Sequence, residues 1–222
     1  EARGQILAIP HNANLSNGRM FAVEDSSGSA FDSDYAKRRA RLEPLVEVTQ
    51  IKGDAEAHPL LSPDDEFADF ETWDFGNLHV LNTVPKEAGQ IEFEYARSAL
   101  KNGLREAART GTNPFKFGMI GSTDAHTSLA TAAEDDFWGK TTNVEPGPRS
   151  KNVSMSLGDT PGSVLFDTWD FVASGYAAVW ATENTREAIF AAMQRKEVYA
   201  TTGSRIAVRL FGGWDFDAMD LD

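Results

Sequence analysis

The chain has 222 residues and a mass of 24.3 kDa, which suits one large domain or two small ones. Hydrophobic residues make up 41% and charged residues 25%, ordinary values for a folded soluble protein that exclude a disordered tail or a coiled coil. The formal net charge of −13 argues against nucleic-acid binding and docking on anionic lipid, and no apolar run reaches the roughly 18–20 residues of a membrane-spanning helix.

The N-terminal part of the sequence predicts a strand, a helix and a second strand. Residues 5–9 form a short, mostly apolar run that ends at Pro10, which is typical of a strand buried on both faces. Residues 32–42 predict a basic helix, which Pro44 ends. Residues 45–51 are rich in β-branched side chains and predict the next strand.

An acidic segment follows over residues 62–75. A calcium-binding loop would need alternating ligands around a glycine turn, a pattern that this segment lacks. We therefore interpret it as a solvated surface segment. Its acidic residues are Asp64, Asp65, Glu66, Asp69, Glu71 and Asp74.

The clearest helix prediction covers residues 91–110, with Gly111 as a suitable C-cap. Its apolar side chains recur at spacings of three and four residues, which predicts one core-facing side. Residues 115–120 predict a strand that leads directly into polar residues. The apolar side chains of the helix are Phe93, Ala96, Leu100, Leu104 and Ala107.

The remaining chain predicts a loop-rich insert followed by a strand, a helix and a strand. Residues 134–174 are rich in Gly, Pro, Asn and Asp and are typical of an active-site lid or insert. Residues 176–180 predict a strand, and Asn184 is expected to cap the next helix, with Glu187 at the capping-box position. Residues 205–211 alternate in polarity and predict a closing strand.

Strands and helices alternate along the whole sequence, which is the pattern of an α/β protein with a largely parallel sheet. We treat residues 1–222 as a single domain. The chain starts at Glu1 without a leader and ends soon after a predicted strand. We expect a piece of a longer protein, with a mature protein after leader cleavage as the alternative.

Few residues of this sequence are candidates for catalysis or metal binding. Cysteine is absent, which excludes disulfides, thiolate zinc sites and cysteine nucleophiles, so His, Asp, Glu and water must hold any metal. His11 and His126 each follow a predicted strand, where functional groups gather in parallel α/β folds. Asp124 and His126 can reach the same side of the chain and suit Zn, Mn or Fe. A lone Asp-x-His is more often an ordinary hydrogen-bonded pair; the second strand-end histidine favours a metal.

These strand-end motifs are similar to those of the PHP superfamily of metal-dependent hydrolases, named for its polymerase and histidinol-phosphatase members. Gly-Ser-Thr-Asp-Ala-His at residues 121–126 is similar to its last metal motif, and Ile-Pro-His-Asn at residues 9–12 resembles an earlier one. Residues 185–189 and 198–203 resemble its closing helix and strand. Over most of its length the chain more closely resembles a large bacterial family of PHP-like proteins of unknown function.

The resemblance implies a portion of a distorted PHP-type (β/α)7 barrel around two or three divalent ions of Zn, Mn or Fe. The first ligands of the superfamily, a His-x-His pair, have no counterpart, since no histidine precedes His11. We therefore expect the C-terminal part of the barrel, lacking its first strands and binding metal poorly alone. Carried over by residue, the resemblance makes His11, Asp124, His126 and, as a further candidate, His58 the metal ligands.

The resemblance implies a phosphoesterase that uses a metal-activated water on a small phosphorylated molecule. The same centre would serve hydrolysis of a carbon ester, amide or carbamate, and a non-catalytic interaction domain is the third alternative. The sequence lacks Gly-x-Gly-x-x-Gly and Gly-x-Ser-x-Gly, which argues against NAD and serine-hydrolase chemistry. We expect no nucleic-acid partner and no membrane insertion, in a soluble protein of the cytoplasm, the periplasm or the exterior.

Overall fold

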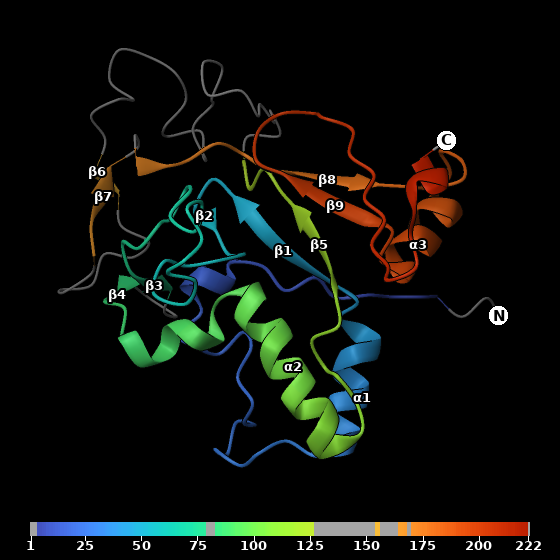
Figure 1. Ribbon diagram of the computed structural model, residues 1–222. Helices are drawn as coiled ribbons and strands as arrows, with labels where there is room; N and C mark the ends of the chain where they lie inside the picture. Colours follow the sequence, from blue (N-terminus) through green and yellow to red (C-terminus); the bar gives the residue numbers. More distant parts are fainter. Residues whose placement is uncertain (1–3, 79–82, 127–153, 156–163, 168–169, 222) are drawn as a thin grey trace.

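The computed structural model describes residues 4–78, 83–126, 154–155, 164–167 and 170–221 (Figure 1). Within these ranges the chain has mixed α/β structure with four small sheets, and they form no closed barrel. The α/β prediction is confirmed at this level, and the barrel stays a prediction. His79 matches none of the motifs, and we expect it to be structural; it lies outside the described residues, as does most of the insert at 134–174.

The largest sheet holds the two strands that precede the candidate motifs. β1 (Leu45–Gln50) pairs in parallel with β5 (Gly118–Gly121) and antiparallel with β2 (Gly53–Asp54), as Figure 1 shows. Glu47 lies opposite Ile120, so both long strands end at the same edge of the sheet. Every β1 residue is buried, in agreement with the predicted strand at 45–51.

The other described strands form three two-stranded sheets. All three are antiparallel, so the described part of the chain has one parallel pairing among five, and the largely parallel sheet is not found there. Alternation of strands and helices along a chain does not by itself fix strand direction. The three pairs are β3 (Asn77–Leu78) with β4 (Thr83–Val84), β6 (Ser154–Met155) with β7 (Phe166–Asp167), and β8 (Tyr176–Val179) with β9 (Val198–Thr201).

Two helices have side-chain caps at their N-termini. The Asp32 carboxylate accepts a hydrogen bond from the backbone N–H of Tyr35 at 2.7 Å and starts α1 (Ser33–Leu42), which confirms the helix predicted at residues 32–42. The hydroxyl of Thr185, and not Asn184, accepts from the N–H of Ala188 at 3.3 Å and starts α3 (Arg186–Arg195). No helix in the described ranges is long and apolar enough to cross a membrane.

The third helix, α2 (Ala96–Thr110), starts later than predicted, after the 3-10 helix η2 (Ala88–Phe93). Gly111 ends α2 with φ of 80°, which confirms the predicted C-cap. The predicted apolar face is wrong in part, because the Leu104 side chain is 70% exposed. The buried residues of α2 are small or polar, namely Ala96, Ala99, Asn102, Gly103 and Glu106.

Two predicted strands do not form. Residues 5–9 run without regular pairing, and the N–H of Ala8 donates to the carbonyl of Leu42 at 2.6 Å. Residues 205–211 lie outside any sheet, and Leu210 is 89% exposed. The apolar pattern was present in both runs, but a ladder of hydrogen bonds also needs a neighbouring strand edge.

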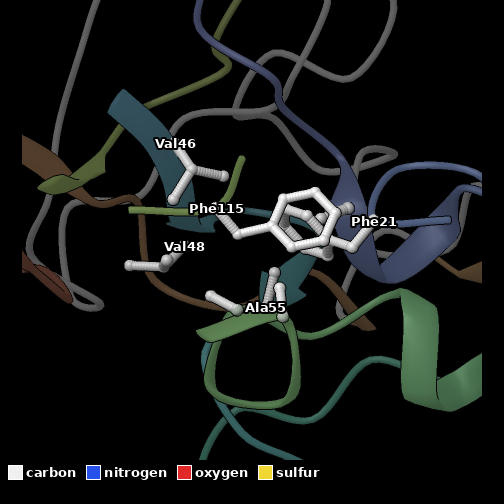
Figure 2. Packing of buried hydrophobic residues seen from close by; sticks show 8 residues of the cluster. Phe21, Val46, Val48, Ala55 and Phe115 are labelled. Atoms are coloured by element: carbon white, nitrogen blue, oxygen red, sulfur yellow. The ribbon is translucent and has the colours of Figure 1, made fainter. Parts of the chain in front are cut away.

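The main core lies beneath β1. Phe21 and Phe115 pack edge to face with ring centroids 5.8 Å apart, and Figure 2 shows Val46, Val48 and Ala55 around them. A second cluster surrounds Trp73, with Leu15 and Phe166 as its other buried members. The two clusters hold the N-terminal segment and the acidic segment against the sheet.

Two glycines let the β8–β9 pair approach the central sheet. A Cβ on Gly121 would lie 2.8 Å from the backbone of Tyr176, and a Cβ on Gly175 would lie 2.8 Å from the carbonyl of Thr49. Side chains at either position would force the strands apart. The close approach thereby fixes where the chain leaves β5, at the start of the candidate motif.

Candidate functional site

The edge where β1 and β5 end carries a connected set of polar side chains, here called the polar network. It joins three segments that are distant in sequence: the one after residue 9, the end of β1, and the turn after β5. Its members are His11, Asn12, Glu47, Gln50, Lys52, Ser122, Asp124 and His126.

Glu47 holds these three segments together. Its side chain is buried, and Oε1 accepts hydrogen bonds from the backbone N–H of Asn12 at 3.2 Å and from Nε2 of Gln50 at 3.1 Å. Its Oε2 accepts from the hydroxyl of Ser122. A buried carboxylate needs such partners, because an unpaired one is costly. Glu47 therefore fixes the relative position of both strand-end motifs.

Lys52 links β1 to the Asp-x-His motif. Its side chain is 3% exposed, and Nζ donates to Oε1 of Gln50 at 2.7 Å and forms an ion pair with Oδ2 of Asp124. Asp124 has a positive φ of 46°, a conformation that Asp tolerates better than most residues. The ammonium group thus holds the Asp124 carboxylate in place at the turn.

The structure brings Asp124 and His126 together, as the motif predicts. Nε2 of His126 lies 3.2 Å from Oδ1 of Asp124, and the His126 side chain is 58% exposed. A carboxylate in this position orients an imidazole and stabilises its protonated form. The pair therefore presents an oriented, solvent-accessible imidazole at the end of β5.

His11 lies at the other end of the polar network. Its Nδ1 is 2.6 Å from Nδ2 of Asn12, and Oδ1 of Asn12 accepts from Nε2 of Gln50 at 2.6 Å. His11 is exposed. The network connects it to the Asp124–His126 pair through side chains rather than by direct contact.

His58 belongs to a different cluster. It is buried, its Nδ1 accepts from the N–H of Leu60 at 3.1 Å, and its Nε2 therefore carries the proton that it donates to Asp74 at 2.9 Å. The hydroxyl of Tyr95 also reaches Asp74, at 3.5 Å. A metal bond at His58 would displace one of these partners, and its role as a ligand stays a prediction.

Comparison with known proteins identifies the family. The family model described as "Protein of unknown function (DUF3604)" matches residues 1–222. The chain belongs to this family. No curated protein and no solved structure shows significant similarity to it.

The match corrects the resemblance to the PHP superfamily. The model that covers the whole chain is DUF3604, and none of the comparisons shows a PHP protein. Short strand-end motifs such as Asp-x-His are weak markers of ancestry, because strand ends carry polar sites in many unrelated folds. The function of this DUF3604 chain therefore has to be argued from its own residues.

The polar network contains carboxylate and imidazole groups, which can bind a divalent metal. The structure does not bring enough of these groups together to surround an ion. No group of three or more His, Cys, Asp or Glu side chains in the described ranges could hold a metal ion. One oxygen of Asp124 faces Lys52 and the other faces His126. The described residues of the DUF3604 chain do not fit a complete metal centre, and we derive no chemical step through one.

Sequence reasoning missed Gln50 and Lys52, which connect the two strand-end motifs. Neither belongs to a recognisable motif. The signal that could have found them is their position, because Gln50 ends a strand whose residues are all buried and Lys52 follows it closely. Long polar side chains at such positions need partners, and the partners lie at the adjoining strand end.

Asp54 on β2 predicts an unusual pH dependence of stability. Burial raises its pKa from 3.8 to about 7, against the lowering effect of hydrogen bonds from the N–H groups of Ala57 and Glu56. Of the charged groups that face it, Glu56 raises the pKa and Arg97 lowers it. The folded state therefore binds this proton more tightly than the unfolded chain. Its stabilising contribution is complete below pH 3.8 and is lost as the pH rises to about 7.

We therefore expect Asp54→Asn to be more stable than the wild type at pH 8, by about 2 kcal/mol, because the amide never ionises. The advantage should grow from pH 4 to pH 8. Urea denaturation at each pH measures it, with Asp34→Asn, at a carboxylate with 78% side-chain exposure, as the control. An advantage that is constant across the pH range would contradict the assignment.

Proposed function

We propose that the polar network is the centre of a hydrolase that acts on a small molecule, and that His126 and Asp124 carry its proton transfer. One observation supports this most directly. An exposed imidazole is oriented by Asp124, which a buried lysine holds in turn. Such a layered arrangement is costly to build and is a common feature of catalytic centres.

In this proposal His126 acts as a general base. Its imidazole removes a proton from a water molecule as that water attacks the substrate, and Asp124 stabilises the resulting imidazolium. The imidazolium then gives the proton to the leaving-group oxygen as the ester bond breaks, which restores the neutral imidazole. Lys52 is a positioning residue, because its 3% exposure keeps it from contacting substrate while it fixes Asp124. Glu47 and Ser122 hold the end of β5 in register with β1.

We propose a phosphoester as the substrate class and a carbon ester, amide or carbamate as the alternative. The same proton transfer serves both, so a paired screen has to separate them. The proposed proton transfer does not require a metal. A divalent Zn, Mn or Fe ion would be an additional component of the site. It would need at least one donor besides Asp124 and His126, and the described residues supply none in place.

The test combines a hydrolysis screen with elemental analysis. p-Nitrophenyl phosphate and p-nitrophenyl acetate are incubated with the purified protein, with and without added Mn²⁺ or Zn²⁺. We expect turnover that falls at least about tenfold in the Asp124→Ala, His126→Ala double variant. Plasma mass spectrometry on both proteins reports any bound metal and its loss.

The control is Asp34→Asn, which changes an exposed carboxylate on α1 that is not part of the polar network. Equal turnover in the double variant and the control would overturn the assignment of His126 and Asp124. Absence of turnover on every ester, with or without metal, would overturn the hydrolase proposal for this chain.

A second candidate, a non-catalytic interaction domain, is favoured by one observation. Apolar side chains near the C-terminal end of the described chain are unusually exposed, including Leu210 at 89%, Trp214 at 102% and Met219 at 83%. Large apolar side chains that stay exposed are candidates for a protein contact. Inactivity on esters together with stable self-association in analytical ultracentrifugation would favour this candidate.

A further inference from the structure

A cavity of ≈ 440 Å³ opens beside β1, and its lining includes no member of the polar network. Val48 of β1 and Ala200 of β9 form an apolar part of its wall. Asp54 and Glu56 contribute carboxylates, and Phe67 and Phe70 contribute aromatic rings. The volume lies within the range of small-molecule sites.

The two aromatic side chains are exposed within an acidic segment. Phe67 is 71% and Phe70 is 52% exposed. Exposed phenyl rings beside carboxylates combine a negative ring face with negative charge. That combination attracts organic cations, whose charge the ring faces stabilise and whose apolar part the rings cover.

The charge in the cavity rests mainly on Asp54. Both oxygens of Glu56 accept hydrogen bonds from Arg97, at 2.8 and 2.9 Å, so that carboxylate is already balanced. Asp54 forms no ion pair within the described part of the chain, and its carboxylate accepts hydrogen bonds only from backbone N–H groups there, including that of Ala57 at 3.0 Å. A cationic ligand would provide the missing counter-charge.

Thr49 gives a second, independent indication of a ligand. Thr49 lines the cavity and is only 1% exposed, yet its hydroxyl has no hydrogen-bond partner among the described residues. Leaving a buried hydroxyl unpaired is unfavourable. A ligand with a hydrogen-bonding head group would satisfy it.

We propose that this cavity binds a small organic ammonium ion that carries an apolar group. Asp54 faces the ammonium, the Thr49 hydroxyl accepts one of its protons, and Phe67 and Phe70 flank the apolar part. The overall charge of −13 further attracts a cation. The inference stands apart from the hydrolase proposal, since none of these residues belongs to the polar network.

The test measures binding of benzylammonium by isothermal titration calorimetry at pH 8, where Asp54 is ionised, with benzyl alcohol as the neutral analogue. We expect saturable binding of benzylammonium and none of benzyl alcohol. Phe70→Ala and Asp54→Asn should each weaken binding about fivefold or more. Leu60→Ala, at a residue that is 69% exposed and outside the cavity lining, should leave binding unchanged.

Three results would overturn the proposal: no benzylammonium binding, equal binding of benzyl alcohol, or unchanged binding in Phe70→Ala and Asp54→Asn. Phe70 is half exposed and Asp54→Asn is expected to fold, so loss of binding is not explained by unfolding. Circular dichroism of each variant checks this directly. Binding is measured without substrate, and its outcome is independent of whether the chain hydrolyses esters.

Discussion

Replacement of Trp73 by alanine is expected to lower the free energy of unfolding by about 3–5 kcal/mol. Trp73 is fully buried, and its ring lies 5.0 Å from the rings of both Phe75 and Phe166. It also stacks on Phe171, with ring planes 4° apart. Removal of the indole would leave a large apolar cavity that these neighbours can fill only in part.

The hydrogen bond of Trp73 adds to the effect. Its Nε1 donates to the carbonyl of Asp170 at 2.8 Å, and the two residues are 97 positions apart in the sequence. Alanine therefore also removes a hydrogen bond between distant segments of the chain. Urea denaturation followed by far-ultraviolet circular dichroism measures the loss. Trp214→Ala is the matched control, because Trp214 is fully exposed and should change stability by less than about 0.5 kcal/mol. Similar losses in the two variants would contradict the packing described.

Lys52→Met is expected to lower the free energy of unfolding by about 3 kcal/mol. Methionine has a similar length but leaves the carboxylate of Asp124, with 18% side-chain exposure, without its buried cation. Lys37→Met is the control, since the Lys37–Asp34 pair spans 3.6 Å between side chains that are 62% and 78% exposed. That exposed pair is worth about 0.5 kcal/mol or less.

A double-mutant cycle separates the ion pair from simple packing. If Asp124 is destabilising only when it is left unpaired, Lys52→Met combined with Asp124→Asn should recover part of the stability lost in Lys52→Met alone. Losses that add without recovery, or a single loss below about 1 kcal/mol, would show that the pair does not hold the turn after β5.

Sequence patterns correctly predicted those helices and strands that are specified by residues within them or next to them. The helix at residues 32–42 was predicted from its own basic run and from Pro44, which follows it, and the structure has α1 at Ser33–Leu42. The end of α2 was found because Gly111 takes a left-handed conformation there. The strand at 45–51 was found because a buried strand has few polar interruptions. Each of these signals is carried by residues within a few positions of the element.

Features that depend on distant partners were missed or wrong. Residues 205–211 have the alternation of a strand but pair with no strand in the described structure. Leu104 fits a helical apolar face, yet its side chain is exposed and α2 buries small or polar residues instead. Gly103 leaves room for the side chain of Asn113, a contact that the helix pattern alone does not reveal. At the candidate site, the Asp124–His126 contact follows from a one-residue spacing, whereas Lys52 lies 72 residues from Asp124.

The buried Glu47 has a consequence for how the molecule folds. Its contacts reach 35 residues back to Asn12 and 75 residues forward to Ser122, so two long chain loops must close before the carboxylate is satisfied. Contacts of such high sequence separation form slowly and late. The polar network should therefore be assembled only in molecules that have completed folding, and a spectroscopic probe placed at His126 would report the last stage of that process rather than the collapse of the helices.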